Sequence, residues 1–410
     1  MITYPQAREL LLNAATLVTK PVLETCKLVD LPGRISAAPI TASANLPAFD
    51  NSAMDGFTLK AIAAAGPVQL PVLQQILAGQ SVGDQPSHGA VQIMTGAPVP
   101  KWCETVVPIE NVEAKQNADG QVVSIELTGP VPTDRHIRRA GEDVQIGEEL
   151  IAAGRIFTPE DIMMLAALGL DEVQVLARPK ITLISTGAEL VDDPAKSLQP
   201  GQIRNSNQPY LAALLNNWPV EINPLSGHPD DAKSFLALMD QARDGQAQII
   251  ISTGAVSMGV RDFVPAALSA LGATTIFHKC RIRPGKPVLF AKLPDGTLFF
   301  GLPGNPVSAA VGLHFFVMPV LRKILMQSER PIRHAQLSKD FSKRAGLTMF
   351  AKARVTSRDA KMQIEVLSGQ ESFRIKPLLQ ANCWAELPQD ASDLAAGSLV
   401  RFHPFTEGLV

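Results

Sequence analysis

The sequence predicts a multidomain protein of the α/β plus β class, with a central α/β domain and small β domains on either side of it. At 410 residues the chain is too long for one hydrophobic core, so two to four domains are expected. Strand and helix patterns alternate from Lys180 onward, which is typical of an α/β domain. Short strands separated by glycine and proline dominate residues 45–139 and 328–410, and these two regions are predicted to be β domains.

Two apolar runs locate the region where function is expected. Residues 181–187 read Ile-Thr-Leu-Ile-Ser-Thr-Gly, and residues 249–254 read Ile-Ile-Ile-Ser-Thr-Gly. Runs without polar alternation that stop at glycine are typical of buried parallel strands. Their ends should lie together at the carboxyl edge of the sheet, where open α/β sheets bind ligands. Two proline-glycine segments follow, at 283–287 and 301–308, so we expect the site within residues 181–308.

Composition excludes several classes of partner. The chain is 46% hydrophobic and 19% charged with a net charge of −2, so neither nucleic acid nor a strongly charged partner is expected. The four cysteines are far apart in sequence, which argues against a disulfide framework or a zinc site and is consistent with a reducing cytoplasm. The most apolar run, residues 306–321, is too short for a membrane span, so we expect a buried helix there and no membrane contact.

The remaining elements follow from periodicity and turn residues. Thr3 is a plausible N-cap for an amphipathic helix that reaches Val18, and Thr158-Pro159 begins a second helix that ends near Leu168. Asp295-Gly296 predicts a hairpin turn. In the α/β domain we predict strands at 180–186, 220–225, 248–253, 274–279, 287–292 and 297–300, and helices near 207–217, 230–243, 263–271 and 306–326. In the first β domain we predict strands at 69–72, 89–95, 105–109 and 121–127.

The segment around Asn305 has the features of an anion site. Asn305 is a suitable N-cap and Pro306 a suitable first helical residue, while Pro303 and Gly304 precede them. A helix start that glycine leaves accessible binds anions, most often phosphate. The alternative is an ordinary capped core helix. Lys279, Arg283 and Lys286 lie shortly before it and are either oxyanion ligands or a solvated basic loop.

Three carboxylates follow predicted strands at the same edge of the sheet. Glu189, Asp230 and Asp262 are positioned to hold Mg²⁺ beside a phosphate. Each is alternatively a surface acid or a helix cap, and Asp230 directly precedes a helix. On composition alone Asp55-Gly56 and residues 94–98 indicate turns. His278 has no Ser or Cys partner at a suitable spacing, so a nucleophilic triad is not supported.

These segments, in this order, closely resemble the molybdopterin molybdenumtransferases, the MoeA and gephyrin E-domain family. The likeness spans nearly the whole chain, and the order of the motifs is far more specific than any motif alone. The matching segments are Asn51–Gly56, Met94–Pro98, Ile137–Asp143, Ser185–Leu190, Gly201–Ile203 with Ser206-Asn207, Ser252–Asp262, Pro284–Pro287 and Leu302–Ser308.

The resemblance implies an elongated protein with four domains. These are a linker domain (1–44 and 140–178, with the N-terminal helix free to pack on the α/β domain), an inserted β domain (45–139), an α/β molybdopterin-binding domain (179–327) and a C-terminal β domain (328–410). It also implies an enzyme of molybdenum cofactor biosynthesis in the cytoplasm. Such an enzyme inserts molybdate into adenylated molybdopterin, hydrolyses the adenylate with Mg²⁺, and releases molybdenum cofactor and AMP.

The resemblance further implies partners and site residues. The chain is expected to be a homodimer whose site is completed across the interface, with possible contacts to the adenylylating enzyme of the pathway and to molybdoenzyme apoproteins. The residues implied for activity are Asp55, Thr95, Glu189, Asp230 and Asp262, the last three as Mg²⁺ ligands. Those expected to bind pterin or oxyanion are Thr186, Gly187, Ser257, Lys279, Arg283, Lys286, Pro287, Pro303, Gly304, Asn305, Ser308 and Lys352.

The chain departs from the family pattern at several positions. Ala188 and Ala255 stand where an Asp and a Gly are usual, and Asn205 replaces an Asp. Lys352 replaces an Arg, and Lys376-Pro377 replaces a Ser pair, both among the molybdate contacts. These changes motivate an alternative, a diverged paralogue that carries molybdopterin or molybdenum cofactor without efficient insertion. A structural scaffold and a general Mg²⁺-dependent nucleotide hydrolase are further alternatives.

Overall fold

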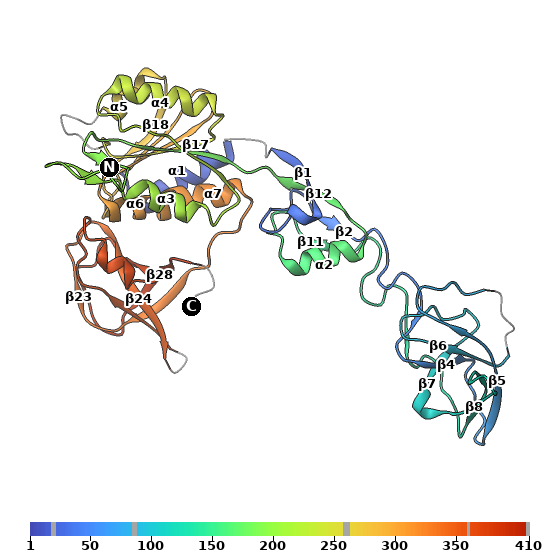
Figure 1. Cartoon of the computed structure of the whole chain (residues 1–410). Coiled ribbons are helices and arrows are strands. Elements are labelled where there is room, and N and C mark those ends of the chain that lie inside the picture. Colours follow the sequence, from blue (N-terminus) through green and yellow to red (C-terminus); the bar gives the residue numbers. More distant parts are fainter. Residues whose placement is uncertain (18–21, 84–87, 257–262, 359–360, 407–410) are drawn as a thin grey trace.

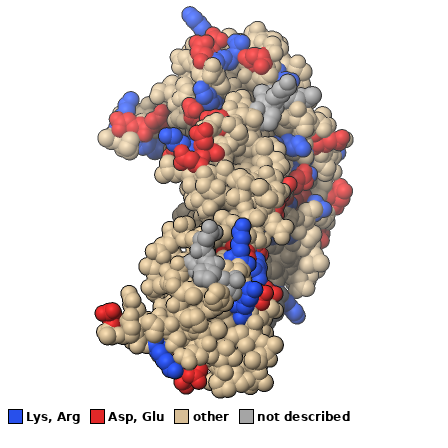
Figure 2. Space-filling view, turned by 90° about the vertical axis from the view of Figure 1, so that its right-hand side faces the viewer, with Lys and Arg blue, Asp and Glu red and all other residues tan. Residues whose placement is uncertain are grey.

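The computed structural model describes residues 1–17, 22–83, 88–256, 263–358 and 361–406. The chain is elongated (Figure 1): the α/β and C-terminal domains form one end, a small linker domain lies in the middle, and the inserted β domain forms the far end. The predicted α/β plus β class is confirmed. On the face that Figure 2 shows, basic and acidic side chains of the described residues are interspersed in small groups, without a broad field of one sign.

The central sheet brings the predicted strands together. Its order is β16-β13-β17-β21-β20-β18, with only β20 antiparallel to its neighbours among these strands. Ser185 pairs with Thr253, and Thr253 with Leu302, so three parallel strands end level with one another. The bounds are Glu221–Pro224 (β16), Lys180–Ser185 (β13), Ile249–Thr253 (β17), Leu298–Leu302 (β21), Leu289–Lys292 (β20) and Thr274–His278 (β18).

Helices cover both faces of this sheet, which explains why its inner strands β13, β17 and β21 are buried without polar alternation. Ile249 and Ile251 belong to the core under one helical layer, and Ile250 to the core under the other. The first layer holds α1 (Tyr4–Leu17), α3 (Asn207–Leu215) and a continuous helix made of α6 (Pro306–Gly312), a π-helical turn (Leu313–Val317) and α7 (Met318–Ile324). The second holds α4 (Ala232–Asp244) and α5 (Val264–Ala270).

The apolar helix of the first layer lies where a helix near 306–326 is predicted. It runs from Pro306 to Ile324, and by length and composition it could cross a membrane. It is mostly buried inside the domain, where its phenylalanines pack with Tyr4 of α1. A fully covered core helix is apolar all round, as a membrane span is, so the burial accounts for its composition.

The linker domain is built from segments on either side of the inserted domain, residues 45–139. In the linker, β1 pairs with β12 and β2 with β11, and Thr158 begins α2 with the predicted cap, accepting a hydrogen bond from the Asp161 amide. The inserted domain is a six-stranded sheet of order β7-β4-β6-β5-β9-β8. The linker bounds are Leu23–Lys27 (β1), Ile40–Thr41 (β2), Glu149–Ile151 (β11), Pro159–Ala167 (α2) and Glu172–Leu176 (β12).

The inserted domain contains strands that the sequence did not predict. Gly56–Leu59 (β4) follows directly from the expected Asp55-Gly56 turn and pairs on both sides, and Glu113–Gln116 (β8) was also missed. Both are too short for a period to be recognised. The other bounds are Val68–Ile76 (β5), Ala90–Ile93 (β6), Thr105–Pro108 (β7) and Val122–Leu127 (β9), with Asn51–Ser52 (β3) and Ile137–Arg138 (β10) paired beside the sheet.

The C-terminal domain is a closed ring of strands joined to the α/β domain. The ring runs β24-β25-β22-β28-β26 and closes through a second pairing between β26 and β24. A segment of the α/β domain, Ile282–Arg283 (β19), pairs with β24 and so belongs to this sheet. The bounds are Arg333–Leu337 (β22), Thr348–Arg358 (β24), Lys361–Val366 (β25), Cys383–Leu387 (β26) and Leu399–Pro404 (β28). Short pairs complete the fold: Leu190–Val191 (β14) with Ile203–Arg204 (β15), and Phe341–Ser342 (β23) with Asp393–Leu394 (β27).

Candidate functional site

The loops after β13, β17 and β21 are packed backbone against backbone at the carboxyl edge of the sheet. The Thr186 amide and hydroxyl both donate to the Thr253 carbonyl, at 2.9 and 3.0 Å, and the Gly254 amide donates to the Leu302 carbonyl at 2.9 Å. Gly254 has φ +93°, and a Cβ there would lie 2.6 Å from the Thr186 Oγ1. Only glycine fits this crossing, so the edge is a preformed surface of small residues and backbone amides.

Helix α6 begins at this edge, but its own N-cap side chain does not cap it. Asn305 occupies the N-cap position without a side-chain cap hydrogen bond, which corrects the expected role of that side chain. Instead the Val307 amide donates to the carbonyl of Ser372 in the C-terminal domain, at 3.0 Å. Gly304 and Asn305 are exposed, whereas Pro303 and Ser308 are buried.

The predicted basic segment is a rigid loop beside the start of α6. The Lys279 amide donates to the Val288 carbonyl and the Cys280 amide to the Lys286 carbonyl, which closes residues 279–288 into a compact turn. Gly285 has φ +95°, and a Cβ there would meet the Ser308 carbonyl oxygen at 3.5 Å. Arg283 and Lys286 are exposed, and Pro287 is half-buried. The loop therefore holds two cationic side chains in the solvent next to a helix N-terminus, where an anion gains from both.

Two of the predicted carboxylates lie at the same edge. Glu189 and Asp230 are both exposed, and the Gly187 amide donates to the Pro229 carbonyl at 3.1 Å, which joins their two segments. A Cβ on Gly187 would lie 2.6 Å from both Glu189 carboxylate oxygens. The cap of α4 is Asp231, whose Oδ1 accepts from the Ser234 amide, so Asp230 is not the cap. Asp262 and Ser257 lie outside the described residues.

These acids fit Mg²⁺ by their chemistry. The ion takes oxygen ligands and keeps several waters, so exposed carboxylates beside a phosphate site suit it. Within the residues that the structure describes, no group of three His, Cys, Asp or Glu side chains is close enough to hold a metal. An open site that relies on one or two carboxylates and on substrate phosphates is therefore the arrangement these residues allow.

A polar network that no sequence pattern predicts supports the loop after β13. The Asn205 Nδ2 lies 3.1 Å from the Ser185 Oγ, 3.0 Å from the Asp192 Oδ1 and 3.0 Å from the Gln208 Oε1. His228 contacts the same Asp192 carboxylate at 2.9 Å. Asn205, noted only as a departure, thus joins the end of β13 to the start of α3. Its change from the family's Asp was the one available signal.

Asp55 and Thr95 form a separate cluster in the inserted domain. The Thr95 amide and hydroxyl donate to the Asp55 Oδ1 at 2.7 and 2.8 Å. These bonds, the backbone one first, hold the pKa of the Asp55 carboxyl below its usual value. The inserted domain lies at the opposite end of the molecule from the α/β domain (Figure 1). One chain therefore does not bring Asp55 and Thr95 to the sheet edge.

Lys352 has a different environment from the one expected. The residue is fully buried, and its Nζ donates to the carbonyls of Gly369, Arg374 and Glu371 at 2.6, 3.0 and 3.2 Å. Burial lowers its pKa from the usual lysine value. An ammonium has three donors, and all are used here. This geometry does not present Lys352 to a ligand, so the expected contact with an oxyanion is corrected.

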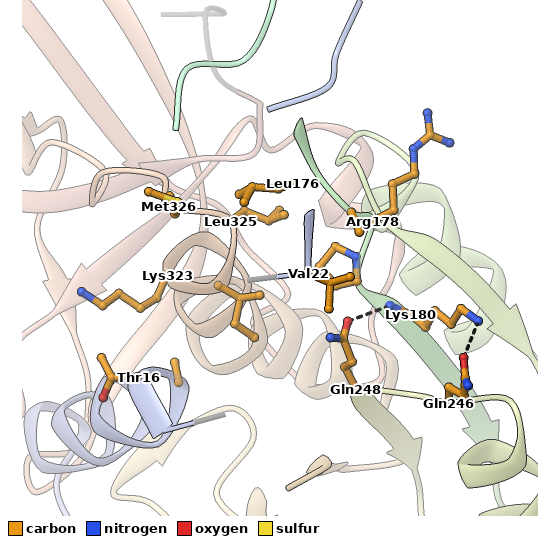
Figure 3. Close-up of a pocket in the computed structure, with 14 residues that line it drawn as sticks. Thr16, Val22, Leu176, Arg178, Lys180, Gln246, Gln248, Lys323, Leu325 and Met326 are labelled. Atoms are coloured by element: carbon orange, nitrogen blue, oxygen red, sulfur yellow. Dashed lines mark hydrogen bonds between the residues drawn. The ribbon is translucent and has the colours of Figure 1, made fainter. Parts of the chain in front are cut away.

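A large cavity lies away from this edge. It has a volume of about 610 Å³ and is lined by the end of α1, the linker segment 176–180 and the end of α7 (Figure 3). Lys180 bonds Gln248 and Gln246 there, each at 3.3 Å. These residues belong to the amino ends of β13 and β17, opposite the candidate site.

Three family models match consecutive parts of the chain. Residues 2–169 match the MoeA N-terminal region (domain I and II), residues 182–323 a probable molybdopterin binding domain, and residues 334–405 the MoeA C-terminal region (domain IV). Together they cover nearly all of the sequence, in the order that the segments of the resemblance follow.

Relatives and solved structures match over the full length. The molybdopterin molybdenumtransferase of Synechococcus elongatus is 39% identical over 98% of both chains, and that of Haemophilus influenzae is 34% identical over 99% of both. Two crystal structures of the molybdopterin biosynthesis MoeA protein from Pyrococcus horikoshii superpose with TM-scores of 0.85 and 0.79, at 25% and 26% identity. They cover 99% and 98% of this chain and 99% of their own.

Proposed function

Because this chain belongs to the MoeA family of molybdopterin molybdenumtransferases, we propose that it inserts molybdate into adenylated molybdopterin and releases molybdenum cofactor and AMP. The chain is a transferase of molybdenum cofactor biosynthesis. The observation that carries the specific reaction is the convergence of three small-residue loops, a helix start and a basic loop at one sheet edge.

The edge suits a ligand with a phosphoanhydride. Glycines at 187, 254 and 304 keep side chains away from this part of the edge, so the phosphates of a substrate can come close to the main chain. The start of α6 supplies the positive end of a helix dipole. Arg283 and Lys286, exposed beside it, supply the charge that molybdate and phosphate oxygens require.

The hydrolysis requires positioning and charge neutralisation rather than a protein nucleophile. Water attacks one phosphorus of the anhydride, and the bond from that phosphorus to the bridging oxygen breaks. AMP and the molybdopterin phosphate then separate, the attacked phosphate with the oxygen of water and the other with the bridging oxygen. Arg283 and Lys286 stabilise the charge that accumulates on the oxygens. Glu189, Asp230 and Asp262 would hold Mg²⁺, which when bound neutralises charge on the phosphate oxygens.

A second copy of the chain is proposed to complete the site. Asp55 and Thr95 lie on an inserted domain that extends away from their own sheet edge (Figure 1). In a two-fold dimer in which the tip of one chain meets the sheet edge of the other, the same contact forms a second time, because such an interface is reciprocal. This arrangement gives Asp55 the access to substrate that one chain withholds.

The setting and the further partners are also proposed. All four cysteines are buried and unpaired, which supports a reducing cytoplasm. The substrate has to arrive from an adenylylating enzyme, and the product has to pass to molybdoenzyme apoproteins, so transient contacts with both classes are expected.

The test is AMP release by purified protein supplied with adenylated molybdopterin, Mg²⁺ and molybdate. We expect molybdate to stimulate AMP release, and Asp262→Ala to abolish the stimulation. Tight binding of adenylated molybdopterin without molybdate-dependent AMP release would contradict insertion. That result would favour the alternative, a paralogue that carries molybdopterin or molybdenum cofactor without efficient insertion.

A further inference from the structure

We propose that Lys352 is a positioning residue that holds loop 367–374 of the C-terminal domain across the start of α6, and so fixes the helix end where the oxyanion binds. The inference deepens the proposed function and rests on it for the identity of the ligand. Its structural part is the set of contacts that joins Lys352 to loop 367–374 and that loop to α6, which we call the clamp. This part rests only on contacts within the chain.

Lys352 lies on the face of β24 that meets the α/β domain. Met349, Ala351 and Ala353 alternate with it and belong to the core of the C-terminal domain. Phe350, two residues before Lys352 and on the same face, stacks on Phe315 of the long helix with ring centroids 3.7 Å apart. The side chain of Lys352 is therefore buried at the junction of two domains rather than inside one.

The ammonium organises the loop from within. Its three donors reach the Gly369, Glu371 and Arg374 carbonyls, all in one turn of chain. The backbone of Lys352 holds the same loop, because its amide donates to the Gln370 Oε1 at 2.9 Å and its carbonyl accepts from the Gln370 Nε2 at 2.8 Å. Loss of the ammonium would leave three buried carbonyls without their hydrogen-bond donor, which lowers the stability of the folded loop.

The organised loop supplies the missing cap of α6. The Ser372 carbonyl, which accepts from the Val307 amide at 3.0 Å, lies between the carbonyls of Glu371 and Arg374 that Lys352 binds. Asn305 leaves this amide to the loop, since its own side chain makes no cap bond. Lys352 thus determines, through Ser372, how the first turn of α6 is completed and which amides remain for an anion.

The test compares Lys352→Met, which keeps the length of the side chain and removes its donors, with Ile364→Ala as the matched control. Ile364 is fully buried in the core of the same domain and is not among the partners of the loop. Amide hydrogen exchange should show lost protection at Val307 and across 367–374 in Lys352→Met, and retained protection there in Ile364→Ala. The KM for molybdate should rise roughly 10- to 100-fold with little change in kcat, the effect of a displaced binding group.

Three outcomes would overturn the proposal. They are unchanged exchange at Val307 in folded Lys352→Met, an equal rise of the molybdate KM in Ile364→Ala, and a loss of kcat with the loop still protected, which would indicate direct contact of Lys352 with the reacting groups. Should Lys352→Met not fold, Gln370→Ala weakens the clamp from the loop side, and the same readouts apply. Absence of molybdate-dependent AMP release in the wild type would refute the proposed function alone, because the exchange at Val307 still tests the clamp.

Discussion

The carboxyl edge of the α/β sheet and the tip of the inserted domain both carry expected site residues, but they are built differently. At the edge, three parallel strands end level, and their loops cross at glycine over a core covered on both faces. At the tip, one exposed carboxylate closes a turn against Thr95. Among the described residues, one chain brings the loops of the edge together but does not bring the tip to them. The difference shows that a site assembled from both requires two chains.

Mixing two inactive variants is the strongest test of this comparison. Asp55→Ala removes the carboxylate at the tip of the inserted domain, and Lys286→Ala removes a cation at the sheet edge. Each variant alone should lower the rate of AMP release about 10²- to 10³-fold, as the loss of one preorganised polar group does. In a mixture whose subunits have exchanged, half of the dimers pair one variant with the other. Each such dimer has one intact site, so roughly a quarter of the wild-type rate should return.

The control is the same mixture of Asp55→Ala with Lys286→Ala after chemical cross-linking of each variant with itself. Cross-linked homodimers cannot exchange subunits, so the rate should stay at the level of the single variants. Recovery in the cross-linked mixture, or none in the exchanged one, would mean that the tip does not serve the partner's edge.

The second prediction concerns the glycines that build the edge. Gly254→Ala places a Cβ 2.6 Å from the Thr186 Oγ1 at a φ of +93°, whereas a Cβ on the neighbouring Gly304 meets only the Gly254 Cα at 3.6 Å, an ordinary contact. We expect Gly254→Ala to cost about 1–3 kcal/mol of unfolding free energy. It should also raise the KM for adenylated molybdopterin. Gly304→Ala is the matched variant and should unfold at nearly the wild-type denaturant midpoint.

Gly56, next to Asp55 in the inserted domain, tests whether this domain and the sheet edge unfold independently. A Cβ on Gly56 would overlap the carbonyl oxygen of Val107 in the neighbouring strand β7. Gly56→Ala should therefore loosen the inserted domain and leave hydrogen exchange at the sheet edge unchanged. Equal loss of protection at the edge would show that the two regions unfold together.

The third prediction separates two adjacent acids, one assigned to function and one to structure. Asp231 caps α4 through the Ser234 amide, whereas Asp230 is exposed and is not the cap. Asp231→Ala should lower the thermal unfolding midpoint with little effect on activity. Asp230→Ala should lower AMP release about 10-fold or more at limiting Mg²⁺, with recovery as Mg²⁺ is raised, because its proposed role is to hold the metal. A rate that excess Mg²⁺ does not restore would argue against that role.

The parts of the fold that sequence predicted are those with a clear period. The apolar runs at 181–185 and 249–253 indicated parallel strands, because only strands covered on both faces lack polar alternation. Thr158 was predicted as a cap from its own neighbours, and its side chain is one. Local patterns suffice where the stabilising contacts are local.

The features that sequence could not predict depend on contacts between distant segments. Asn305 occupies a cap position, but the carbonyl that caps the helix comes from Ser372, 67 residues onward by their numbers. Lys352 is a cation in a motif position, yet its ammonium faces inward onto three carbonyls. Asp231 rather than Asp230 caps α4, a shift of one residue that propensity does not resolve.

The smallest expected effect is at the tip, in the titration of Asp55. Its pKa is lowered first by the Thr95 amide and then by the Thr95 hydroxyl, so Thr95→Val removes the second donor and leaves the first. We expect the pKa to move upward but to stay below that of an ordinary carboxyl, which is about 4. Because the pKa of Asp55 is lower in the folded protein than in the unfolded chain, its ionisation stabilises the turn at pH values above the unfolded-chain pKa. This stabilisation is lost as the pH falls through the pKa of the folded protein. Carboxylate NMR titration measures it directly.

Asp393 is the matched control for that titration, because its pKa is lowered by the hydroxyls of Ser342 and Ser392 without a backbone donor among the causes. Ser342→Ala should therefore return the pKa of Asp393 closer to the ordinary value than Thr95→Val returns that of Asp55. If the Asp55 pKa instead rises fully in Thr95→Val, the turn depends on the hydroxyl rather than on the backbone. The tip would then be a flexible carboxylate that the partner chain has to order, rather than a preformed group that it receives.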